Sequence, residues 1–433
     1  MSTTDVGPIT RGERIGSLDV LRGVAVCGIL LMNIPIMGMI GMVGRPHYPV
    51  GFDIDWIAYS VQSLVFEGSM RGLFTLLFGA GMLIMLRHLE SEAVARATQA
   101  YFTRCFALML LGVANFAFFL WPGEILTNYG IDGLALFLFR KADLRVLLTA
   151  AAAILIITSV AMGTPSIDRG QKVHDGIVAA AAKAEGKKLT DEQKEALEGR
   201  TKMMGFLHPK PAEVAKETAQ RTSFPGVLVW SAKTWVQFNW TPETIAFFGE
   251  SLAFMLLGLF LFRTGVLSGE RSLGFYALLA AGGYGLGFLV RGALLAYQWR
   301  AGFEPTQYGG IYSNFTYELG RLPITLGLTG LILLLFKAGA LNWLKGALSA
   351  IGRLALTNYV GQSIITSIIF YGFALVGKFD FAALMGIAAL IWIGQGIFSV
   401  LWLKRYEMGP AEALLRSLTY GAWRPMGRAG QTG

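Results

Sequence analysis

Long apolar stretches alternate with short polar connections along almost the whole chain. Stretches of about 17 to 25 apolar residues are typical of helices that span a lipid bilayer. Ten segments have this form, with the second and fourth the shortest: Leu18–Val43, Leu73–Arg87, Cys105–Trp121, Ile125–Phe139, Leu144–Met162, Thr244–Phe262, Leu273–Tyr297, Glu318–Lys337, Leu348–Val376 and Phe381–Leu403. The pattern predicts an all-α polytopic membrane protein with about ten transmembrane helices in two bundles.

A long polar segment separates the first five predicted helices from the last five. We therefore expect an N-terminal transmembrane bundle over residues 1–163 and an extracytoplasmic helical loop over residues 164–240. A C-terminal bundle with a cytoplasmic tail should follow over residues 241–433.

The polar segment carries helix signals of its own. Thr190 and Gln193 have the spacing of a capping box. A second polar helix should end near Arg221, and the aromatic residues of Val227–Trp240 are typical of a helix at the membrane interface. A small helical cap without chemistry is the simpler interpretation of this loop, and a binding domain is the alternative.

Composition agrees with a membrane protein. Apolar residues make up 54% of the chain and charged residues 15%, which excludes an ordinary soluble globular protein. The net charge is +9, but the basic residues lie between hydrophobic segments, so we expect the lipid bilayer and no nucleic acid as partner. Cys27 and Cys105 lie inside apolar stretches, which excludes a disulfide framework, and we expect no metal site.

The first predicted helix carries candidate binding residues. Asp19 and Arg22 are three residues apart and share a helical face at the predicted cytoplasmic rim. They could form a structural ion pair, or Arg22 could anchor an anionic ligand. Asn33 interrupts the same apolar stretch and is a further candidate for ligand binding.

The first predicted outer loop, residues 45–71, concentrates polar residues. His47 lies near several carboxylates, and a histidine with a carboxylate partner is a common general base. A histidine with a purely surface position is the alternative. Arg71, at the start of the next apolar stretch, is a candidate ligand-binding residue.

A predicted outer hairpin, residues 121–133, and the ninth predicted helix supply the remaining candidates. Glu124 is a catalytic candidate, although a carboxylate at a helix start is also favourable on structural grounds alone. Tyr129 is a candidate for ligand binding. Arg353, Asn358 and Gln362 have roughly helical spacing, and they could line a ligand cavity or join neighbouring helices.

A series of short motifs runs over nearly the whole chain except the polar loop: Leu18-Asp19-Val20-Leu21-Arg22-Gly23, Gly28-Ile29-Leu30, Asn33, Leu73-Phe74, Leu77-Phe78-Gly79-Ala80-Gly81, Ile125-Leu126, Tyr129-Gly130, Met255-Leu256-Leu257-Gly258, Gly352-Arg353-Leu354-Ala355-Leu356-Thr357-Asn358-Tyr359, Gln362, Gly409-Pro410, Glu412, Arg416 and Leu418-Thr419. In sequence and in order, these motifs resemble those of the YeiB-like bacterial inner-membrane proteins, which carry a C-terminal domain of unknown function numbered 418.

The opening helix of this family is similar to that of transmembrane acyltransferases such as heparan-glucosaminide acetyltransferase. That resemblance implies transfer of an acyl group from cytoplasmic acyl-CoA to an acceptor on the other side, by means of a membrane histidine. This chain departs from the family at two positions. It has Asn115 where family members often have histidine, and Glu124 where they usually have aspartate.

The leading functional hypothesis is therefore acyl transfer at the inner membrane. Arg22 would hold the phosphates of an acyl-CoA donor, which is a substrate and not a bound cofactor, and His47 would be the base. The acceptor would be a lipid, a glycan or a small molecule, and an oligomer is compatible with the sequence. Transport of a small anionic or amphipathic solute is the second hypothesis, and a non-catalytic membrane component is the third.

The distribution of Lys and Arg predicts the topology. Nineteen of them lie in segments that are cytoplasmic if both termini are inside, against four in the short outer loops. Reporter fusions after Gly186 should therefore give an extracytoplasmic signal, and fusions after Arg96, Gly269 and Gly433 a cytoplasmic one. A cytoplasmic signal at Gly186 would contradict the predicted number of spans.

Overall fold

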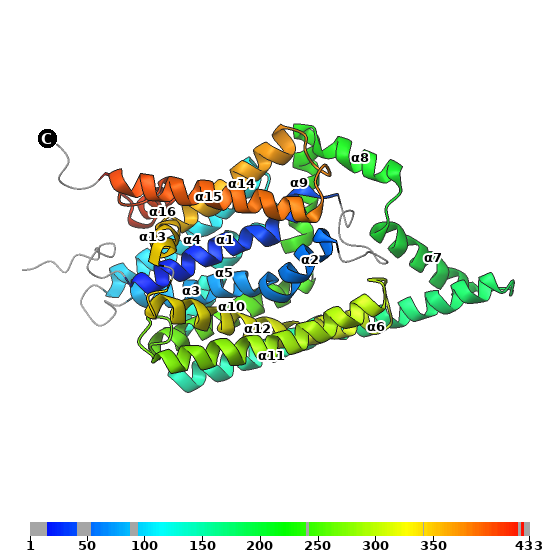
Figure 1. Ribbon diagram of the computed structural model, residues 1–433, viewed down its shortest axis with the longest axis horizontal. Helices are drawn as coiled ribbons and strands as arrows, with labels where there is room; N and C mark the ends of the chain where they lie inside the picture. Colours follow the sequence, from blue (N-terminus) through cyan, green and yellow to red (C-terminus); the bar gives the residue numbers. More distant parts are fainter. Residues whose placement is uncertain are drawn as a thin grey trace, which may run out of the picture.

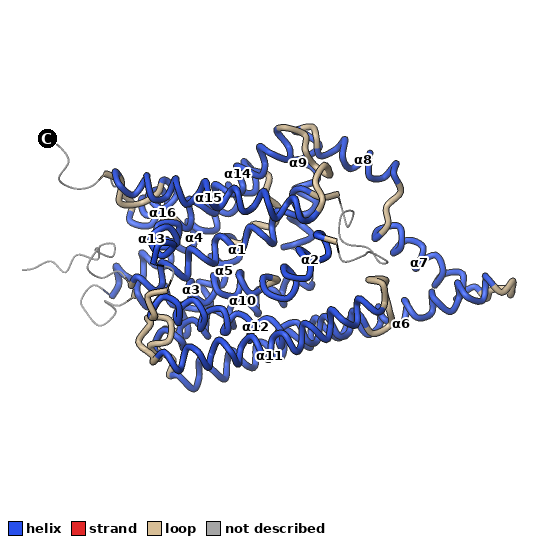
Figure 2. The backbone as a smooth tube through the Cα atoms, viewed as in Figure 1, coloured by secondary structure: helices blue, strands red, loops and turns tan. Residues whose placement is uncertain are grey.

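The described part of the protein is helical throughout (Figures 1 and 2). The computed structural model describes residues 15–40, 53–86, 94–239, 242–340, 342–422 and 426–427. Its helices are α1 (Gly16–Gly38), α2 (Ile54–Val61), the π-helix η2 (Gln62–Phe66), α3 (Ser69–Met85), α4 (Val94–Phe119), α5 (Leu126–Leu136), the 3₁₀ turn η3 (Phe137–Phe139), α6 (Leu144–Ala184), α7 (Asp191–Leu207), α8 (Pro211–Arg221), α9 (Phe224–Asn239), α10 (Pro242–Arg263), α11 (Leu273–Arg300), α12 (Gly309–Lys337), α13 (Asn342–Arg353), α14 (Ala355–Ser367), the π-helix η4 (Ile368–Gly372), α15 (Phe381–Arg405) and α16 (Pro410–Tyr420).

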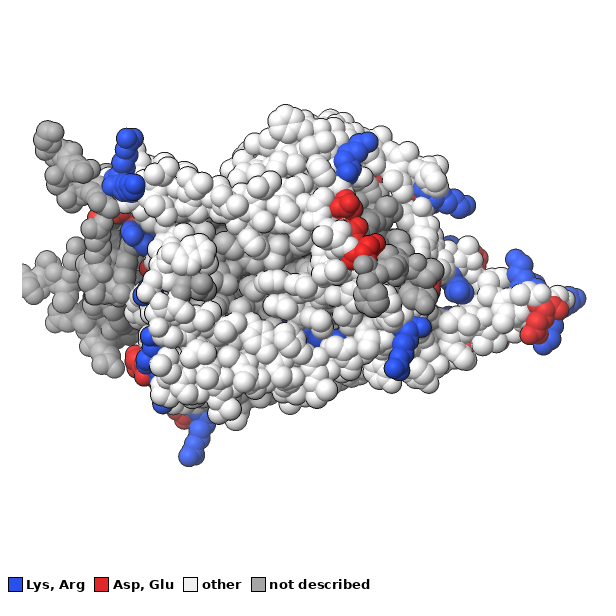
Figure 3. Space-filling model, in the orientation of Figure 1, with Lys and Arg blue, Asp and Glu red and all other residues white. Residues whose placement is uncertain are grey.

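The chain is an all-α polytopic membrane protein. Among the described residues, eight helical segments are long and apolar enough to cross a bilayer: Gly16–Gly38, Ile54–Met85, Ala95–Phe119, Leu144–Ala184, Ala246–Arg263, Leu273–Arg300, Gly309–Lys337 and Phe381–Arg405. Figure 3 agrees, because on the face shown most charged side chains lie toward the two ends and leave a largely uncharged band between them.

Two of the ten predicted segments are not long helices. The fourth, predicted over Ile125–Phe139, is a short apolar helix over Leu126–Phe139. The ninth, Leu348–Val376, was predicted as one helix, but it breaks between α13 and α14, where Leu354 has φ −106° and ψ 33°. The break is stable because the first backbone N–H groups of α14 bond the side chain of Glu412.

The helix of the fifth predicted span continues into the polar loop. The fifth predicted span ended at Met162, but α6 continues through Pro165 to Ala184 and projects beyond the bundle, where α7 packs against it (Figure 1). The predicted capping box of Thr190 and Gln193 is confirmed. The second polar helix, α8, ends at Arg221 as predicted.

Helices from the two halves of the sequence pack against each other. Helix α1 packs on α13, α14 and α15, and α3 and α6 both pack on α10 and α12. One large apolar core contains residues from both halves. Figure 1 places α16 and α13 at one end of the molecule and α8 and α9 at the other, and we call these the α16 end and the α9 end.

Glycines allow the closest helix crossings. A Cβ atom at Gly79 would meet the backbone carbonyl of Met255, and one at Gly258 would meet that of Leu76, so α3 and α10 approach backbone to backbone. Gly23 and Gly352 have the same relation where α1 crosses α13. Small residues permit such close packing between helices in membranes.

We predict that Gly258→Ala destabilises the protein by about 1–3 kcal/mol, because the added methyl group meets a backbone atom that cannot turn away. Gly282→Ala is the matched control, since nothing lies within 4 Å of a Cβ at that position in α11. Thermal unfolding in detergent measures both variants. Equal melting temperatures for the two variants would contradict the close α3–α10 crossing.

Candidate functional site

A cavity of about 310 Å³ lies at the α16 end. Its walls come from α1, α3, α4, α5, α13, α14 and α16, so both halves of the sequence build it. This volume lies at the lower end of the range of small-molecule sites. Four arginines from four different helices line the cavity: Arg22, Arg104, Arg353 and Arg416.

The crossing of α1 and α13 places two of these arginines. Arg22 lies three residues after Asp19, and its Nη1 donates to Oδ1 of Asp19 at 3.3 Å. Asp19 is buried, and its backbone carbonyl contacts Gly352, the residue before Arg353. The predicted pair of Asp19 and Arg22 is thus present, and Arg22 also lines the cavity together with Arg353.

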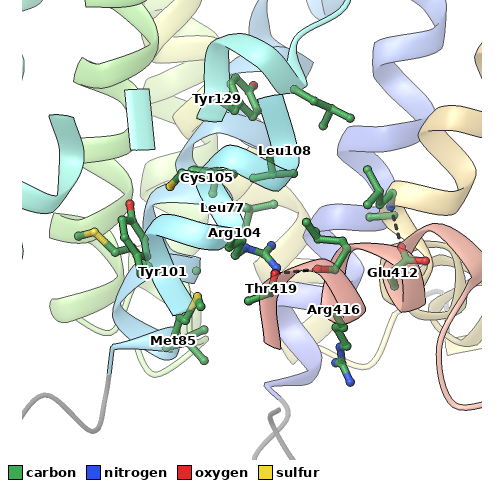
Figure 4. Close-up of a pocket in the computed structure, with 18 of the residues that line it drawn as sticks. Leu77, Met85, Tyr101, Arg104, Cys105, Leu108, Tyr129, Glu412, Arg416 and Thr419 are labelled. Carbon is green, nitrogen blue, oxygen red and sulfur yellow. Dashed lines mark hydrogen bonds between the residues drawn. The ribbon is translucent and has the colours of Figure 1, made fainter. Parts of the chain in front are cut away.

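Helix α16 lies across the cavity and is held there by Glu412. The carboxylate of Glu412 accepts hydrogen bonds from the backbone N–H of Leu356 at 2.8 Å and from N–H and Oγ1 of Thr357 at 3.2 and 2.5 Å. Burial raises the pKa of the Glu412 carboxyl, and these hydrogen bonds oppose the rise. In Figure 4, Arg104 reaches from α4 toward Thr419 of α16, while Arg416 extends outward from the same helix.

The far end of the cavity is apolar and aromatic. Tyr129 packs against Phe74 and Phe78 of α3, with ring centroids 5.8 and 5.3 Å apart. The hydroxyl of Tyr129 lies 2.5 Å from Oγ1 of Thr75. Tyr129 therefore lines the cavity opposite the arginines (Figure 4), and its role in ligand binding stays a prediction.

Tyr359 connects the cavity to a buried carboxylate. Its ring lines the cavity, and its hydroxyl donates to Oε2 of Glu124 at 3.4 Å. Glu124 is 2% exposed and also accepts hydrogen bonds from the Asn115 side-chain amide and the backbone N–H of Leu126. Burial in the hairpin raises the pKa of Glu124 to about 7, against the opposing effect of these bonds. A carboxyl group with such a pKa suits proton transfer near neutral pH.

Other predicted residues lie outside this cavity. Asn358 donates to the carbonyl of Ile351 and to Ser399, and Gln362 donates to the carbonyl of Val26 and to Gln395, so both join helices. Asn33 is half-buried on α1 and does not line the cavity. His47 lies outside the described residues.

Arg71 belongs to a second polar cluster, which joins α3, α10 and α12. Glu250 pairs with both Arg71 and Arg321, and Arg321 Nη1 also lies 3.1 Å from Oε1 of Glu318. The guanidinium groups of Arg71 and Arg321 stack on Phe247 and Phe254. Within the described residues, no group of three or more His, Cys, Asp or Glu has the arrangement of a metal site.

Sequence reasoning missed Arg104, Arg416 and Tyr359 as site residues. Arg104 looked like one of the basic residues that set topology. Arg416 and Tyr359 fall in motifs of the family resemblance, which could have indicated them but gave them no role. Only the packing of α4 and α16 brings Arg104 and Arg416 to one cavity.

Comparison with known proteins shows which family the chain resembles. Residues 261–422 match the family described as "Protein of unknown function (DUF418)". The chain is 25% identical to "Uncharacterized protein YeiB" of Escherichia coli (strain K12), an alignment that covers 95% of this chain and 98% of that protein. The C-terminal part of the chain thus matches the DUF418 family, and the chain is similar to YeiB along nearly its whole length.

Two further relatives align with nearly the full length of this chain. The YeiB-like chain is 28% identical to "Uncharacterized protein YxaH" of Bacillus subtilis (strain 168), over 97% of this chain and 98% of that protein. It is 24% identical to the "Uncharacterized 39.9 kDa protein in amylase 3'region" of Bacillus acidopullulyticus, over 97% of each chain. No solved structure matches the YeiB-like chain significantly.

The cap that Glu412 provides to α14 is directly testable. Glu412→Ala should destabilise this YeiB-like protein by about 0.5–2 kcal/mol, because the first N–H groups of α14 lose their acceptor. Glu412→Gln should retain part of the stability, since its amide oxygen can still accept. Thermal unfolding measures both variants, with Glu195→Ala on the exposed face of α7 as control. A Glu412→Ala variant as stable as the control would show that α14 does not need this cap.

Proposed function

We propose that this protein is a transmembrane acyltransferase of the bacterial inner membrane. It transfers an acyl group from a cytoplasmic acyl-CoA to a hydroxyl or amino group of an acceptor from the other side. The observation that carries this proposal is the cavity with four arginines at the α16 end, which leads through Tyr359 to the buried Glu124.

The arginines account for recognition of the donor. CoA carries several phosphate groups, and the guanidinium group binds phosphate through paired, charge-assisted hydrogen bonds. The charge bias of the loops predicts that the α16 end faces the cytoplasm, where acyl-CoA is found. Arg22, Arg104, Arg353 and Arg416 would hold the phosphates, and the apolar wall beyond them would hold the acyl end of the donor.

Glu124 accounts for the chemical step. The acceptor attacks the thioester carbonyl carbon while the Glu124 carboxylate takes its proton. The carbon–sulfur bond then breaks, and the leaving thiolate of CoA receives that proton, so the reaction needs no further reactant. Asn115 donates to Glu124 and fixes its orientation in this step. His47 remains a predicted base that the same assay can test.

Transport of a small anionic solute is the second candidate. It is favoured by the buried cluster of Arg71, Glu250, Glu318 and Arg321, because ionisable residues at bilayer depth often line a solute pathway. A transporter would need neither CoA binding nor a base beside the cavity, and this difference separates the two candidates.

We predict that purified protein binds CoA and that Arg104→Ala or Arg22→Ala weakens this binding about ten- to a hundredfold, which corresponds to about 1.5–3 kcal/mol. Arg22→Lys should recover part of the affinity, because lysine keeps the positive charge but lacks the paired N–H donors of the guanidinium group. Arg405→Ala, an exposed arginine at the end of α15, is the matched control. Isothermal titration calorimetry with CoA measures all four variants.

Transfer is measured separately with labelled acetyl-CoA and membrane extract as the source of acceptor. Glu124→Gln should abolish transfer and leave CoA affinity unchanged, because a base acts on the chemical step. His47→Ala should have the same effect only if His47 is a base. Absence of CoA binding by the intact protein would refute the acyltransferase and favour the transporter.

A further inference from the structure

Helix α9 covers the hairpin that carries Glu124. Ser231, in the middle of α9, is 0% exposed, and its hydroxyl donates to the carbonyl of Leu120 at 3.0 Å. Trp235, one turn later, stacks on Phe116 near the end of α4, with ring centroids 5.0 Å apart. The hairpin is thus covered at the α9 end, while the cavity with the four arginines lies at the α16 end.

The attachment of α8 to the bundle depends on Arg221. Of the eleven residues of α8, all of them described, Arg221 alone is buried, at 1% exposure. Its Nη1 donates to the carbonyl of Met39, and its Nη2 to those of Met37 and Ile36, at 2.6, 2.6 and 3.1 Å. These carbonyls belong to the C-terminal end of α1, where backbone acceptors lack partners within the helix.

The surroundings of Arg221 suit a cation. The C-terminal end of a helix carries partial negative charge, which favours a guanidinium group there. The group also stacks on Trp230 of α9 at 3.9 Å and pairs with Glu217 of α8 at 3.2 Å. The Arg221 side chain therefore joins α8, α9 and α1, so its loss should free both α8 and α9 from the bundle.

Much of the outer surface of α9 contributes little to this attachment. Phe224, Leu228, Val229 and Phe238 are exposed, and only Val227, Ser231 and Asn239 of the described helix are buried. A helix held by so few buried residues needs little free energy to move, because local openings are cheapest where few apolar contacts are broken.

We propose that α8 and α9 form a gate through which the acceptor reaches Glu124 from the α9 end, and that Arg221 is the latch that holds this gate closed. That the molecule passing this gate is an acyl acceptor rests on the proposed acyl transfer. The gate itself is tested without any substrate, so the two proposals can fail separately.

The test measures how fast a buried reporter thiol reacts. Cys27 and Cys105 are replaced by alanine, Ser231→Cys is introduced as reporter, and the full chain is placed in lipid nanodiscs, where both faces meet the solvent. A water-soluble, membrane-impermeant maleimide is added. Adding Arg221→Ala should speed labelling at position 231 at least tenfold, and Arg221→Lys and Glu217→Gln should give smaller increases.

Two controls separate gating from general loosening. Arg200→Ala removes an arginine that packs between α6 and α7, beside Gly176, and should leave the labelling rate at position 231 unchanged. Lys188→Cys, an exposed position near the tip of the loop, should react rapidly in every background.

Three results would overturn the proposal that Arg221 holds the gate closed. One is a folded, monodisperse Arg221→Ala variant whose position 231 is as protected as in the parent. Should Arg221→Ala fail to fold, full protection in both Arg221→Lys and Glu217→Gln would have the same meaning. Equal acceleration by Arg200→Ala would show that the loop loosens as a whole and that Arg221 holds no specific gate.

Discussion

The interior of this protein depends on the pairing of charges that the bilayer cannot solvate. Glu250 on α10 forms ion pairs with both Arg71 of α3 and Arg321 of α12, so one carboxylate joins three helices that come from both halves of the chain. Removing one partner of a buried ion pair typically costs about 3–5 kcal/mol, because the remaining charge is left without compensation. The register of α3, α10 and α12 is thereby restricted, and with it the position of Tyr129, which packs on α3 and lines the cavity.

The need to pair polar groups inside the bilayer also explains why polar residues of the same motif have different roles. Arg353 and Gln362 lie nine residues apart in one motif, but Arg353 lines the cavity while Gln362 bonds α1 and α15. Buried amides find partners on neighbouring helices, whereas arginines at helix ends can remain beside an open cavity. No local pattern in the sequence distinguishes these outcomes, because each depends on which helix lies opposite.

Apolar periodicity predicted the helical fold and most of the spans correctly, because the bilayer imposes that pattern directly. It failed where helix and membrane boundaries differ. The apolar stretch of α6 ends near Met162, but the helix continues past Pro165 and three glycines to Ala184, where Gly163 packs on Phe315 of α12 and Gly176 on Arg200 of α7. Tertiary packing thus overrides the weak helix propensity of this sequence. In the site, Arg22, Tyr129 and Glu124 could be named from the sequence, but Arg104 could not, since its role depends on the distant α16.

The length of α6 has a mechanical consequence for the polar loop. Forty-one residues of α-helix measure about 60 Å, twice the roughly 30 Å of a hydrocarbon core, so about half of α6 stands in water as a rigid rod. Helix α7 packs along this rod and stiffens it further. The short connection between Leu207 and Pro211 joins this rod to α8, so a swing of α8 would bend the chain there. A change in the angle of α8 would therefore leave the rod of α6 and α7 in place.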